Sequence, residues 1–308
     1  MKNYILITGV AGNIGSYLAL SLLKKKYNVI GIDNFLTGKR EKLPNKSYRN
    51  FKFILGDVNN KKKISSIFRS YKIKFVFHFA AVVGVQRTQQ FPLKVMNDIN
   101  GSKSLLELSV KYKVLRFFYS SSSEIYGEPI KLPLQEENSP LNSKLPYSLV
   151  KNVSENYVKI FQEEFDLSYT IFRFFNTFGP NQSEDFVIPK FVKLALKNLP
   201  IPIYGDGLQT RTFLYVDDNI DTIVNCFEKN LFINEVLNIG SNIEYTIIDL
   251  AKKIIKLTNS SSKLKYLPAL TRGDMRRRQP NNNKMRIALG RKFFNLNSAL
   301  QQYINFLK

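Results

Sequence analysis

The sequence predicts an α/β protein whose parallel sheet carries helices on both faces. Short apolar runs alternate with amphipathic helical patterns through the first half of the chain. This alternation is typical of a doubly wound sheet, whose strands are buried on both sides. With 308 residues, 44% of them hydrophobic, the chain is long enough for one composite α/β unit or two closely joined domains.

The first strand and helix are joined by a glycine-rich turn. Residues Ile5 to Ile7 form a short apolar run, and Ile14 to Leu23 carry apolar residues at helical spacing. Gly9, Gly12 and Gly15 occupy the turn between them. Such a turn lets backbone N–H groups approach a pyrophosphate at the helix N-terminus, where the helix dipole favours negative charge.

The second strand, Val29 to Ile32, ends in an acid, Asp33. A carboxylate at this place accepts hydrogen bonds from a ribose diol and repels a 2′-phosphate, so the pattern favours NAD over NADP. The same residues without a ligand would make a tight turn between strand and helix. The order of strand, glycine turn, helix, strand and acid predicts a Rossmann-type site for NAD.

The βα alternation continues as far as Phe175. Strands are expected at Phe51–Leu55, Phe75–Phe79, Phe117–Ser121 and Tyr169–Phe174, and helices at Lys61–Tyr71, Leu93–Lys113 and Tyr147–Glu164. Ligands of such sheets bind at the carboxyl ends of the strands. The residues expected there, beside Gly9 and Asp33, are Asp57, the Ala80–Ala81 turn, Ser120–Glu124 and Asn176.

After Phe175 the pattern changes to loops with glycine and proline. The elements expected there are helices at Pro189–Lys197, Asp217–Glu228 and Ile247–Leu257, and strands at Ile201–Tyr204, Phe213–Val216 and Val236–Ile239. We therefore predict an NAD-binding domain over residues 1–175 and a smaller α/β domain over residues 176–308. Segments within about residues 209–243 are expected to return to the first domain.

Composition limits the compartment and the partners. A single cysteine, Cys226, excludes an internal disulfide, fits a reducing compartment and is expected in the core. No secretory signal or membrane-spanning apolar run is found, so we expect a cytoplasmic protein. The formal net charge is +22, but lysines are spread along the whole chain. This spread indicates compositional drift more than a specific nucleic-acid site.

A serine-rich strand end precedes a paired tyrosine and lysine. The strand end is Ser120-Ser-Ser-Ser-Glu124, and about twenty residues later Tyr147 and Lys151 stand four apart, on one helical face. Tyr48 and Lys52 have the same spacing, but they stand where a polar loop leads into a strand. An ammonium beside Tyr147 is expected to lower its pKa, so that it takes a proton from a sugar hydroxyl while the nicotinamide takes hydride from the same carbon.

At this point the chain resembles the extended short-chain dehydrogenase/reductase family, and within it the NAD-dependent nucleotide-sugar epimerases, dehydratases and decarboxylases. The resemblance covers nearly the whole chain. It rests on Thr8–Gly15, Gly56–Val58, His78–Ala81, Ser120–Gly127, Tyr147 with Lys151, Arg173–Pro180, Tyr204–Phe213 and Gly273–Arg278. The smaller domain is accordingly expected to bind a nucleotide sugar.

The resemblance also implies residue roles. Tyr147 would be the base, Lys151 its activator and a ribose ligand, and Ser122 the hydroxyl partner, with Glu124 as a further catalytic candidate. The implied cofactor-binding residues are Gly9, Gly12, Asn13, Ile14, Gly15, Asp33, Asn34, Asp57, Val58, Ala80, Ala81, Tyr147 and Lys151. The implied substrate-binding residues are Ser122, Ser123, Asn176, Arg211 and Arg276 or Arg277. An arginine fork suits phosphate oxygens, although the arginine cluster could also be a solvated loop.

Family members of this kind share a 4-keto sugar intermediate and differ in the step after it. A 4,6-dehydratase for dTDP-glucose typically has Asp-Glu after the serine, where this chain has Ser123-Glu124. Ser-Glu and the Arg276–Pro280 run resemble UDP-glucuronate decarboxylases, whereas the Ala80–Val85 loop looks closer to epimerases. Glu124 could also merely cap the turn. The leading expectation is a 4-epimerase for a UDP-sugar, followed by a decarboxylase and then a dehydratase.

Three further expectations concern the oligomeric state, an alternative outside the enzymes, and the role of His78. Family members commonly pair through two helices, here Leu93–Lys113 and Tyr147–Glu164, so a homodimer is expected. A non-catalytic NAD-binding scaffold or sensor is the alternative outside enzymes, and the intact Ser122, Tyr147 and Lys151 set argues against it. His78 is interpreted as a structural residue that closes its strand.

Overall fold

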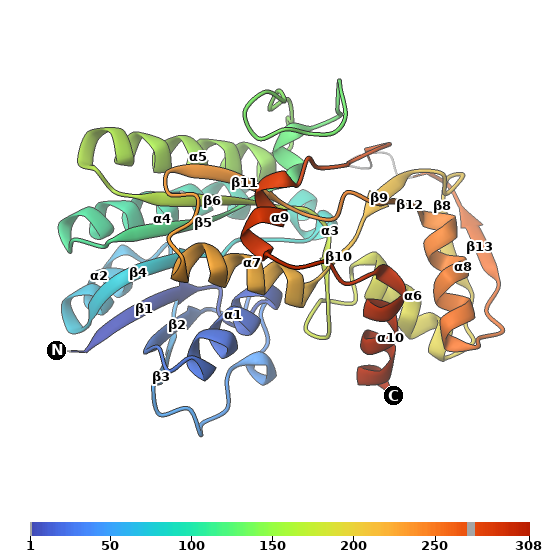
Figure 1. Cartoon of the computed structure of the whole chain (residues 1–308), viewed down its shortest axis with the longest axis horizontal. Coiled ribbons are helices and arrows are strands. Elements are labelled where there is room, and N and C mark those ends of the chain that lie inside the picture. Colours follow the sequence, from blue (N-terminus) through green and yellow to red (C-terminus); the bar gives the residue numbers. More distant parts are fainter. Residues whose placement is uncertain (1, 270–274) are drawn as a thin grey trace.

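The central sheet confirms the predicted fold class. The computed structural model describes residues 2–269 and 275–308, and within them seven parallel strands lie in the spatial order β3-β2-β1-β4-β5-β6-β11 (Figure 1). They are β1 (Asn3–Thr8), β2 (Val29–Asp33), β3 (Phe51–Leu55), β4 (Lys72–His78), β5 (Arg116–Ser122), β6 (Tyr169–Phe174) and β11 (Glu235–Ile239).

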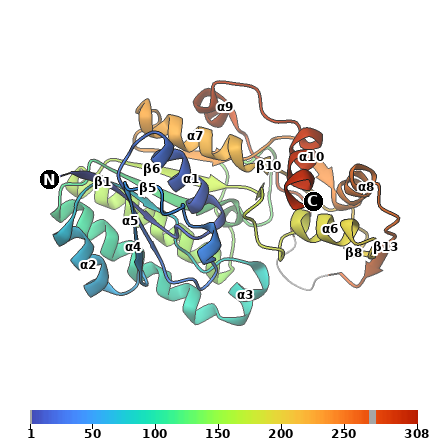
Figure 2. The same ribbon diagram turned by 90° about the horizontal axis from the view of Figure 1, so that it is seen from below.

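Helices cover both faces of this sheet. On one face lie α1 (Asn13–Lys24) and α7 (Val216–Glu228), and on the other lie α2 (Lys61–Ser70), α4 (Pro92–Lys111) and α5 (Pro146–Phe165) (Figures 1 and 2). Because successive strand residues point to opposite faces, neighbours enter different cores. Phe118 packs in the core beneath α1 and α7, whereas Phe117 packs in the core beneath α4 and α5.

The smaller part of the molecule lies at the right of Figure 1. It contains α6 (Val187–Leu196), β8 (Ile201–Tyr204), α8 (Ile247–Thr258), β13 (Leu264–Leu267) and α10 (Leu296–Leu307). Strands β8 and β13 pair in parallel. Of the segments between residues 209 and 243, α7 packs against α1 and β11 pairs with β6, so both lie with the large sheet.

Several short elements were not predicted. They are η1 (Arg40–Lys42), α3 (Val85–Gln90), η2 (Ser123–Tyr126), β7 (Thr177–Phe178), β12 (Glu244–Thr246), β13 and α9 (Asn283–Leu289). The strand expected at Phe213–Val216 is found as the shorter β10 (Leu214–Tyr215), which pairs with β7. The strand before it, β9 (Thr210–Thr212), pairs with β12 and was not predicted. Such strands have too few residues for a repeating apolar pattern.

Helix α10 was also missed, although its sequence carries a helical signal. Its buried residues recur at spacings of one, three and four positions: Leu296, Ala299, Leu300, Tyr303 and Ile304. The Asn295 side chain accepts a hydrogen bond from the backbone of Ser298 and caps the first turn. The apolar spacing and the asparagine cap would therefore have allowed this helix to be predicted from the sequence.

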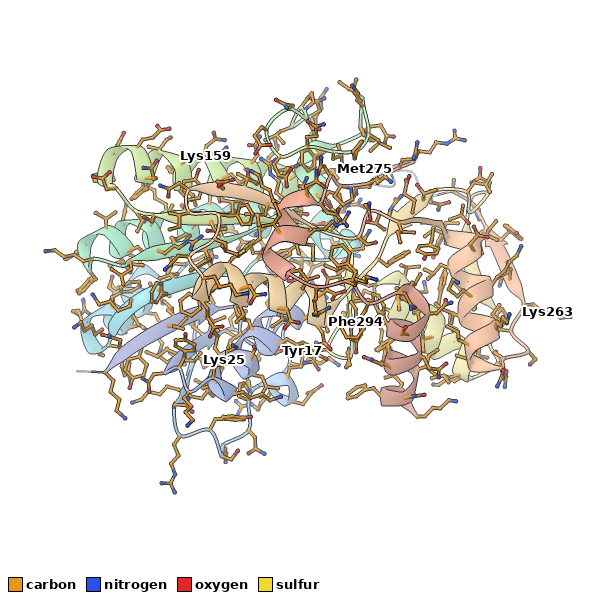
Figure 3. All side chains as sticks on the ribbon, in the orientation of Figure 1. Tyr17, Lys25, Lys159, Lys263, Met275 and Phe294 are labelled. Carbon is orange, nitrogen blue, oxygen red and sulfur yellow. The ribbon has the colours of Figure 1, made fainter. Side chains whose placement is uncertain are left out.

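The outer surface is basic over widely separated regions. Lys25, Lys159 and Lys263 project from different parts of the molecule (Figure 3). Some of these lysines are paired, as Lys25 is with Glu228 at 2.8 Å. In the part of the chain that the structure describes, no helix combines the length and apolarity that crossing a bilayer requires.

Candidate active site

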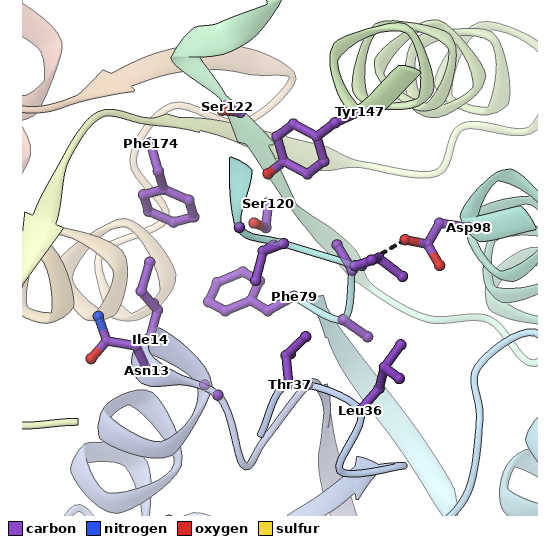
Figure 4. Close-up of a pocket in the computed structure, with 18 of the residues that line it drawn as sticks. Asn13, Ile14, Leu36, Thr37, Phe79, Asp98, Ser120, Ser122, Tyr147 and Phe174 are labelled. Carbon is purple, nitrogen blue, oxygen red and sulfur yellow. Dashed lines mark hydrogen bonds between the residues drawn. The ribbon is translucent and has the colours of Figure 1, made fainter. Parts of the chain in front are cut away.

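A cleft of about 540 Å³ lies at the carboxyl ends of the sheet strands. Figure 4 shows Asn13 and Ile14 at one end of it, and Ser122 and Tyr147 at the other. The predicted residues that line it are Gly9, Gly12, Asn13, Ile14, Gly15, Asp33, Asn34, Asp57, Val58, Ala80, Ala81, Ser122, Ser123, Glu124, Tyr147 and Asn176. Residues from distant parts of the sequence therefore meet here because parallel strands end at one edge.

The glycine turn leaves no room for side chains. Gly9 has φ of +70°, and a Cβ there would lie 2.7 Å from the backbone nitrogen of Ala80. A Cβ on Gly15 would lie 2.2 Å from the Gly9 carbonyl oxygen. Helix α1 begins after Gly12 with no side-chain cap and no acid in its first turn. Its first N–H groups and the positive end of its dipole are thus suited to a diphosphate.

Asp33 is held at the end of β2 by two backbone N–H groups. Its Oδ2 accepts from Ala11 at 2.9 Å and its Oδ1 accepts from Phe35 at 2.8 Å. Because each carboxylate oxygen has a further lone pair, the buried Asp33 can still accept from a ribose diol. Nearby, Asn34 donates to Asp57 at 3.0 Å. The turn and the acid together fit NAD.

His78 has a structural role at the end of β4, as the sequence indicated. Its Nδ1 lies 2.8 Å from the Thr8 hydroxyl and its Nε2 lies 3.0 Å from the Ser102 hydroxyl. Burial, helped by the charge of Lys151, lowers the pKa of His78 to about 3. A neutral imidazole therefore ties β1, β4 and α4 together beneath the cleft.

Ser122, Tyr147 and Lys151 come together where β5 meets α5. Ser122 is the last residue of β5, Tyr147 is the second residue of α5, and Lys151 follows one turn later. The Lys151 ammonium donates to the Ser120 carbonyl at 2.6 Å and lies 5.8 Å from the centre of the Tyr147 ring. Ser122 and Tyr147 both line the cleft, and the Ser122 hydroxyl acts to lower the pKa of Tyr147.

The pKa of Tyr147 moves in the direction opposite to the one expected. Burial raises it, the charge of Glu124 raises it further, and the Ser122 hydroxyl and Arg278 oppose the rise only in part. Burial also lowers the pKa of Lys151 to about 8. In the protein alone, desolvation therefore outweighs the effect that the lysine was expected to have on the tyrosine.

Glu124 and Ser123 lie on η2 and both face an arginine that sequence reasoning missed. Arg278 is buried and lines the cleft, with Nη1 3.3 Å from the Ser123 hydroxyl and 3.9 Å from Glu124 Oε1. Its Nε has no hydrogen-bond partner among the described residues. The Arg276–Arg278 run was noted in the sequence, but only the fold distinguishes its third member.

The other predicted substrate residues take different positions. Asn176 lines the cleft and donates to the Thr212 carbonyl at 3.1 Å. Arg276 and Arg277 are exposed, and Arg277 forms an ion pair with Glu244. Arg211 donates to the Thr210 carbonyl at 2.8 Å, and neither it nor Arg276 or Arg277 is among the described residues that line the cleft. Gly273 and Asp274 of the same motif lie outside the described residues.

The fold and the site define a nicotinamide-dependent enzyme of the doubly wound α/β type. Residues 5–240 match the sequence model of the NAD dependent epimerase/dehydratase family. The chain therefore belongs to this family, and it is an enzyme whose cofactor is NAD.

Curated relatives with three different activities are similar to the chain. A human dTDP-D-glucose 4,6-dehydratase is 33% identical over 84% of this chain and 76% of that protein. A UDP-N-acetyl-alpha-D-glucosaminuronate decarboxylase from Bacillus cytotoxicus is 33% identical over 87% and 84%. A putative UDP-glucose 4-epimerase from Methanocaldococcus jannaschii is 36% identical over 80% and 79%.

Similar solved structures include an epimerase and a dehydratase. A UDP-glucose 4-epimerase from Thermotoga maritima, solved with UDP-glucose, has a TM-score of 0.92 and 32% identity, covering 99% of this chain and 98% of that one. A dTDP-glucose 4,6-dehydratase from Streptomyces venezuelae, solved with NAD, has a TM-score of 0.90 and 26% identity, covering 98% and 96%. The chain is thus an NAD-dependent enzyme of nucleotide-sugar metabolism.

Proposed function

We propose that the chain is a 4-epimerase for a UDP-sugar. The supporting observation is the composition of the cleft wall next to Ser122. The adjacent Ser123 is buried and holds Arg278, so the position that carries an acid in dTDP-glucose dehydratases holds a hydroxyl. A 4-epimerase needs no acid/base pair there beyond the tyrosine and serine.

The chain's own residues would act on the sugar 4-hydroxyl. Tyr147 takes its proton, Ser122 holds its oxygen by a hydrogen bond, and the Lys151 ammonium stabilises the phenolate. NAD, when bound, supplies hydride acceptance and return at C4 and a positive charge that favours the phenolate. Rotation of the oxidised sugar ring within the cleft would present the opposite face of C4 for the return of hydride and so give the C4 epimer.

The residues that bind the two ligands are proposed from their positions and from the family pattern. We assign the glycine turn, Asp33, Asn34, Asp57, Val58, Ala80 and Ala81 to NAD. Asn176 is assigned to the nucleotide sugar, together with Ser122 and Ser123. Arg211, Arg276 and Arg277 remain proposals for the diphosphate.

The direct test is product analysis by mass spectrometry and NMR. Purified protein and NAD are incubated with UDP-glucose, UDP-N-acetylglucosamine and UDP-glucuronate. An unchanged mass with inversion at C4 supports the epimerase. Loss of water or carbon dioxide contradicts it, and bound NAD without turnover of any of the three sugars indicates that the substrate is a nucleotide sugar outside this panel.

One observation supports a uronic-acid decarboxylase as the second candidate. Arg278 presents a buried guanidinium to the cleft, and its Nε has no partner among the described residues. A guanidinium binds carboxylates well because its fork matches their two oxygens. Arg278 could therefore hold the carboxylate of a glucuronate-type substrate beside Glu124.

Replacing the acid of η2 distinguishes these candidates. If the enzyme is an epimerase, Glu124→Gln retains turnover, since Glu124 transfers no proton. If it is a decarboxylase or dehydratase, kcat falls by about 10²–10⁴-fold, the usual contribution of an acid/base group. Steady-state kinetics on the active substrate measures the difference. Glu128→Gln, an exposed change four residues later, is the matched control.

We also propose a homodimer formed through α4 and α5. These helices pack side by side, and Leu149, Val153 and Ile160 of α5 are each about two-fifths exposed along one face. Leu93 at the start of α4 is 80% exposed. A shared apolar face of this kind fits an isologous interface between two copies.

A charge in this face is expected to separate the subunits. Val153→Asp should change the mass measured by light scattering after size exclusion from that of a dimer to that of a monomer, because an unpaired charge would be buried at the interface. Lys62→Glu, on the exposed surface of α2, should remain dimeric. A monomeric wild-type protein would contradict the proposal.

A further inference from the structure

Lysines are concentrated at one end of the smaller part of the molecule. Residues 187–204 and 247–267, which include α6, β8, α8 and β13, contain eight lysines and a single acid, Asp249. About a third of the formal net charge of +22 therefore comes from about an eighth of the chain. A uniform compositional bias does not produce such a concentration, so the charge at this end has a local cause.

The lysines of α6 and α8 lie on the solvent faces of these helices. Lys193 and Lys197 stand four positions apart at the end of α6, Lys252 and Lys256 stand four apart on α8, and all are exposed. Such a spacing places both side chains of a pair on one helical face. Asp249 stands in the first turn of α8, where an acid complements the helix dipole. The opposite faces carry the buried residues Ile188, Phe191, Val192 and Ala195 of α6 and Ile247, Leu250, Ala251 and Ile254 of α8.

Hydrogen bonds between two loops bring the carboxyl ends of α6 and α8 together. Asn198 Oδ1 accepts from the backbone N–H of Ser261 at 2.9 Å. The Ser262 hydroxyl donates to the Leu199 carbonyl at 2.7 Å. The chain then enters β13 through Lys263, which projects at the far right of Figure 3. The basic faces of the two helices therefore reach the same edge of the molecule as the lysines of β13.

The exposed cations of this edge, here called the lysine edge, are Lys193, Lys197, Lys252, Lys256, Lys263 and Lys265. Within the described parts of the chain, Lys193 is the one member that forms an ion pair, with Glu184. None of the six is among the described residues that line the cleft. A helix dipole favours cations only in the last turn, so it does not account for Lys252, Lys263 and Lys265. The charge of the lysine edge is therefore available to a partner outside the active site.

Two exposed apolar side chains stand among these lysines. Leu199 follows α6 and is 45% exposed, and Tyr266 lies on β13 beside Lys265 and is 58% exposed. At the interface of a bilayer, aliphatic chains and aromatic rings enter the headgroup layer while neighbouring cations attract the phosphates. Lysine stems can also lie along that layer with their ammonium groups in water. The lysine edge thus combines charge with apolar contact, as peripheral membrane surfaces do.

We propose that the lysine edge binds the surface of an anionic phospholipid bilayer. All its cations are lysines, and no arginine occurs in residues 187–204 or 247–267. Lysine acts as a point charge, which suits the diffuse negative layer of lipid headgroups, whereas nucleic-acid recognition favours the planar fork of arginine. Because the lysine edge lies outside the cleft, the proposal does not depend on the reaction proposed above.

Vesicle sedimentation measures this binding. The protein is mixed with vesicles of phosphatidylglycerol and phosphatidylcholine in equal parts, and with vesicles of phosphatidylcholine alone. We expect binding only to the anionic vesicles, and weaker binding as salt screens the charges. Each lysine near such a surface contributes about fivefold to the partition coefficient. The triple variant Lys197→Gln, Lys256→Gln and Lys263→Gln should therefore bind about 10²-fold more weakly than the wild type.

A second triple variant separates the lysine edge from the overall charge. The changes Lys61→Gln, Lys62→Gln and Lys63→Gln remove three exposed lysines from α2, at the opposite end of the molecule in Figure 1, and give the same net charge. This variant should bind anionic vesicles nearly as tightly as the wild type. Equal losses in the two triple variants would overturn the proposal, because the attraction would then follow overall charge and not this edge.

A fluorescent reporter tests the contact without removing charge. The chain has no tryptophan, so Leu199→Trp supplies a single indole at the lysine edge. Its emission should shift to the blue on anionic vesicles, whereas that of Leu115→Trp, at an exposed position before β5, should not shift. Absence of vesicle binding at low salt would overturn the proposal. Tighter binding of single-stranded polyuridylate than of vesicles, with the same response of Leu199→Trp, would also overturn it and assign the lysine edge to nucleic acid.

Discussion

Tyr147→Phe should abolish turnover while NAD remains bound. Phenylalanine fills the same space and preserves the apolar contacts with Val95 and Ile99, but it has no group to accept the proton of the sugar hydroxyl. Loss of such a base costs about 10²–10⁴-fold in kcat. Single-turnover kinetics measures the loss, and nucleotide released by heat shows whether the variant still carries NAD.

The chain supplies a matched control for this change. Tyr48 and Lys52 repeat the spacing of Tyr147 and Lys151, yet Tyr48 is not among the described residues that line the cleft. Tyr48→Phe should keep wild-type turnover. A Tyr147→Phe variant with near wild-type kcat would refute the proposed mechanism, and loss of NAD from it would show that the substitution damages the cofactor site instead.

Glu155→Gln should cost about 3–5 kcal/mol of the free energy of unfolding, because it leaves a buried guanidinium without its counter-charge. Arg173 and Glu155 are each 1% exposed. Arg173 Nη1 also donates to the Tyr126 hydroxyl and to the Glu136 carbonyl, both at 2.8 Å. The pair therefore joins α5 and β6 to η2. Urea denaturation should show the full decrease in the free energy of unfolding.

A surface pair provides the comparison. Lys61 and Glu107 lie 2.7 Å apart, with side chains 63% and 37% exposed. Glu107→Gln should change the free energy of unfolding by no more than about 1 kcal/mol, as solvent screens such pairs. Equal losses in the two variants would mean that the buried pair contributes no more than a solvated one.

Much of the fold could be predicted because its signals are local. The turn with Gly9 and Gly15 and the acid at Asp33 each stand next to a recognisable strand, so their place at one sheet edge follows from the βα rule. The spatial order of the strands has no such local signal, and β11 joins the sheet after the chain has passed through α6 and β8 of the smaller part. Short strands such as β7 and β9 form only because distant partners pair with them.

The candidate site was predictable in its outline and less so in its electrostatics. The serine strand end and the Tyr147–Lys151 spacing are visible in the sequence, and the structure brings them together. In the protein without NAD, the pKa of Tyr147 is raised and not lowered as expected from the lysine, because burial depends on what packs above the ring and not on the spacing of two residues. Desolvation is a property of the folded surroundings.

The sequence alone determined the α/β class and NAD as the cofactor, and it pointed to the glycine turn and to the Ser122, Tyr147 and Lys151 set, since each of these signals depends on residue types at short spacings. Tertiary structure decided which arginine of the Arg276–Arg278 run reaches the cleft, and that Asp98 lines it. Arg278 turns inward to Ser123 while Arg277 turns outward to Glu244. Asp98 meets the site only because α4 packs on α5. These contacts join residues up to 155 positions apart, a separation over which no local pattern specifies a partner.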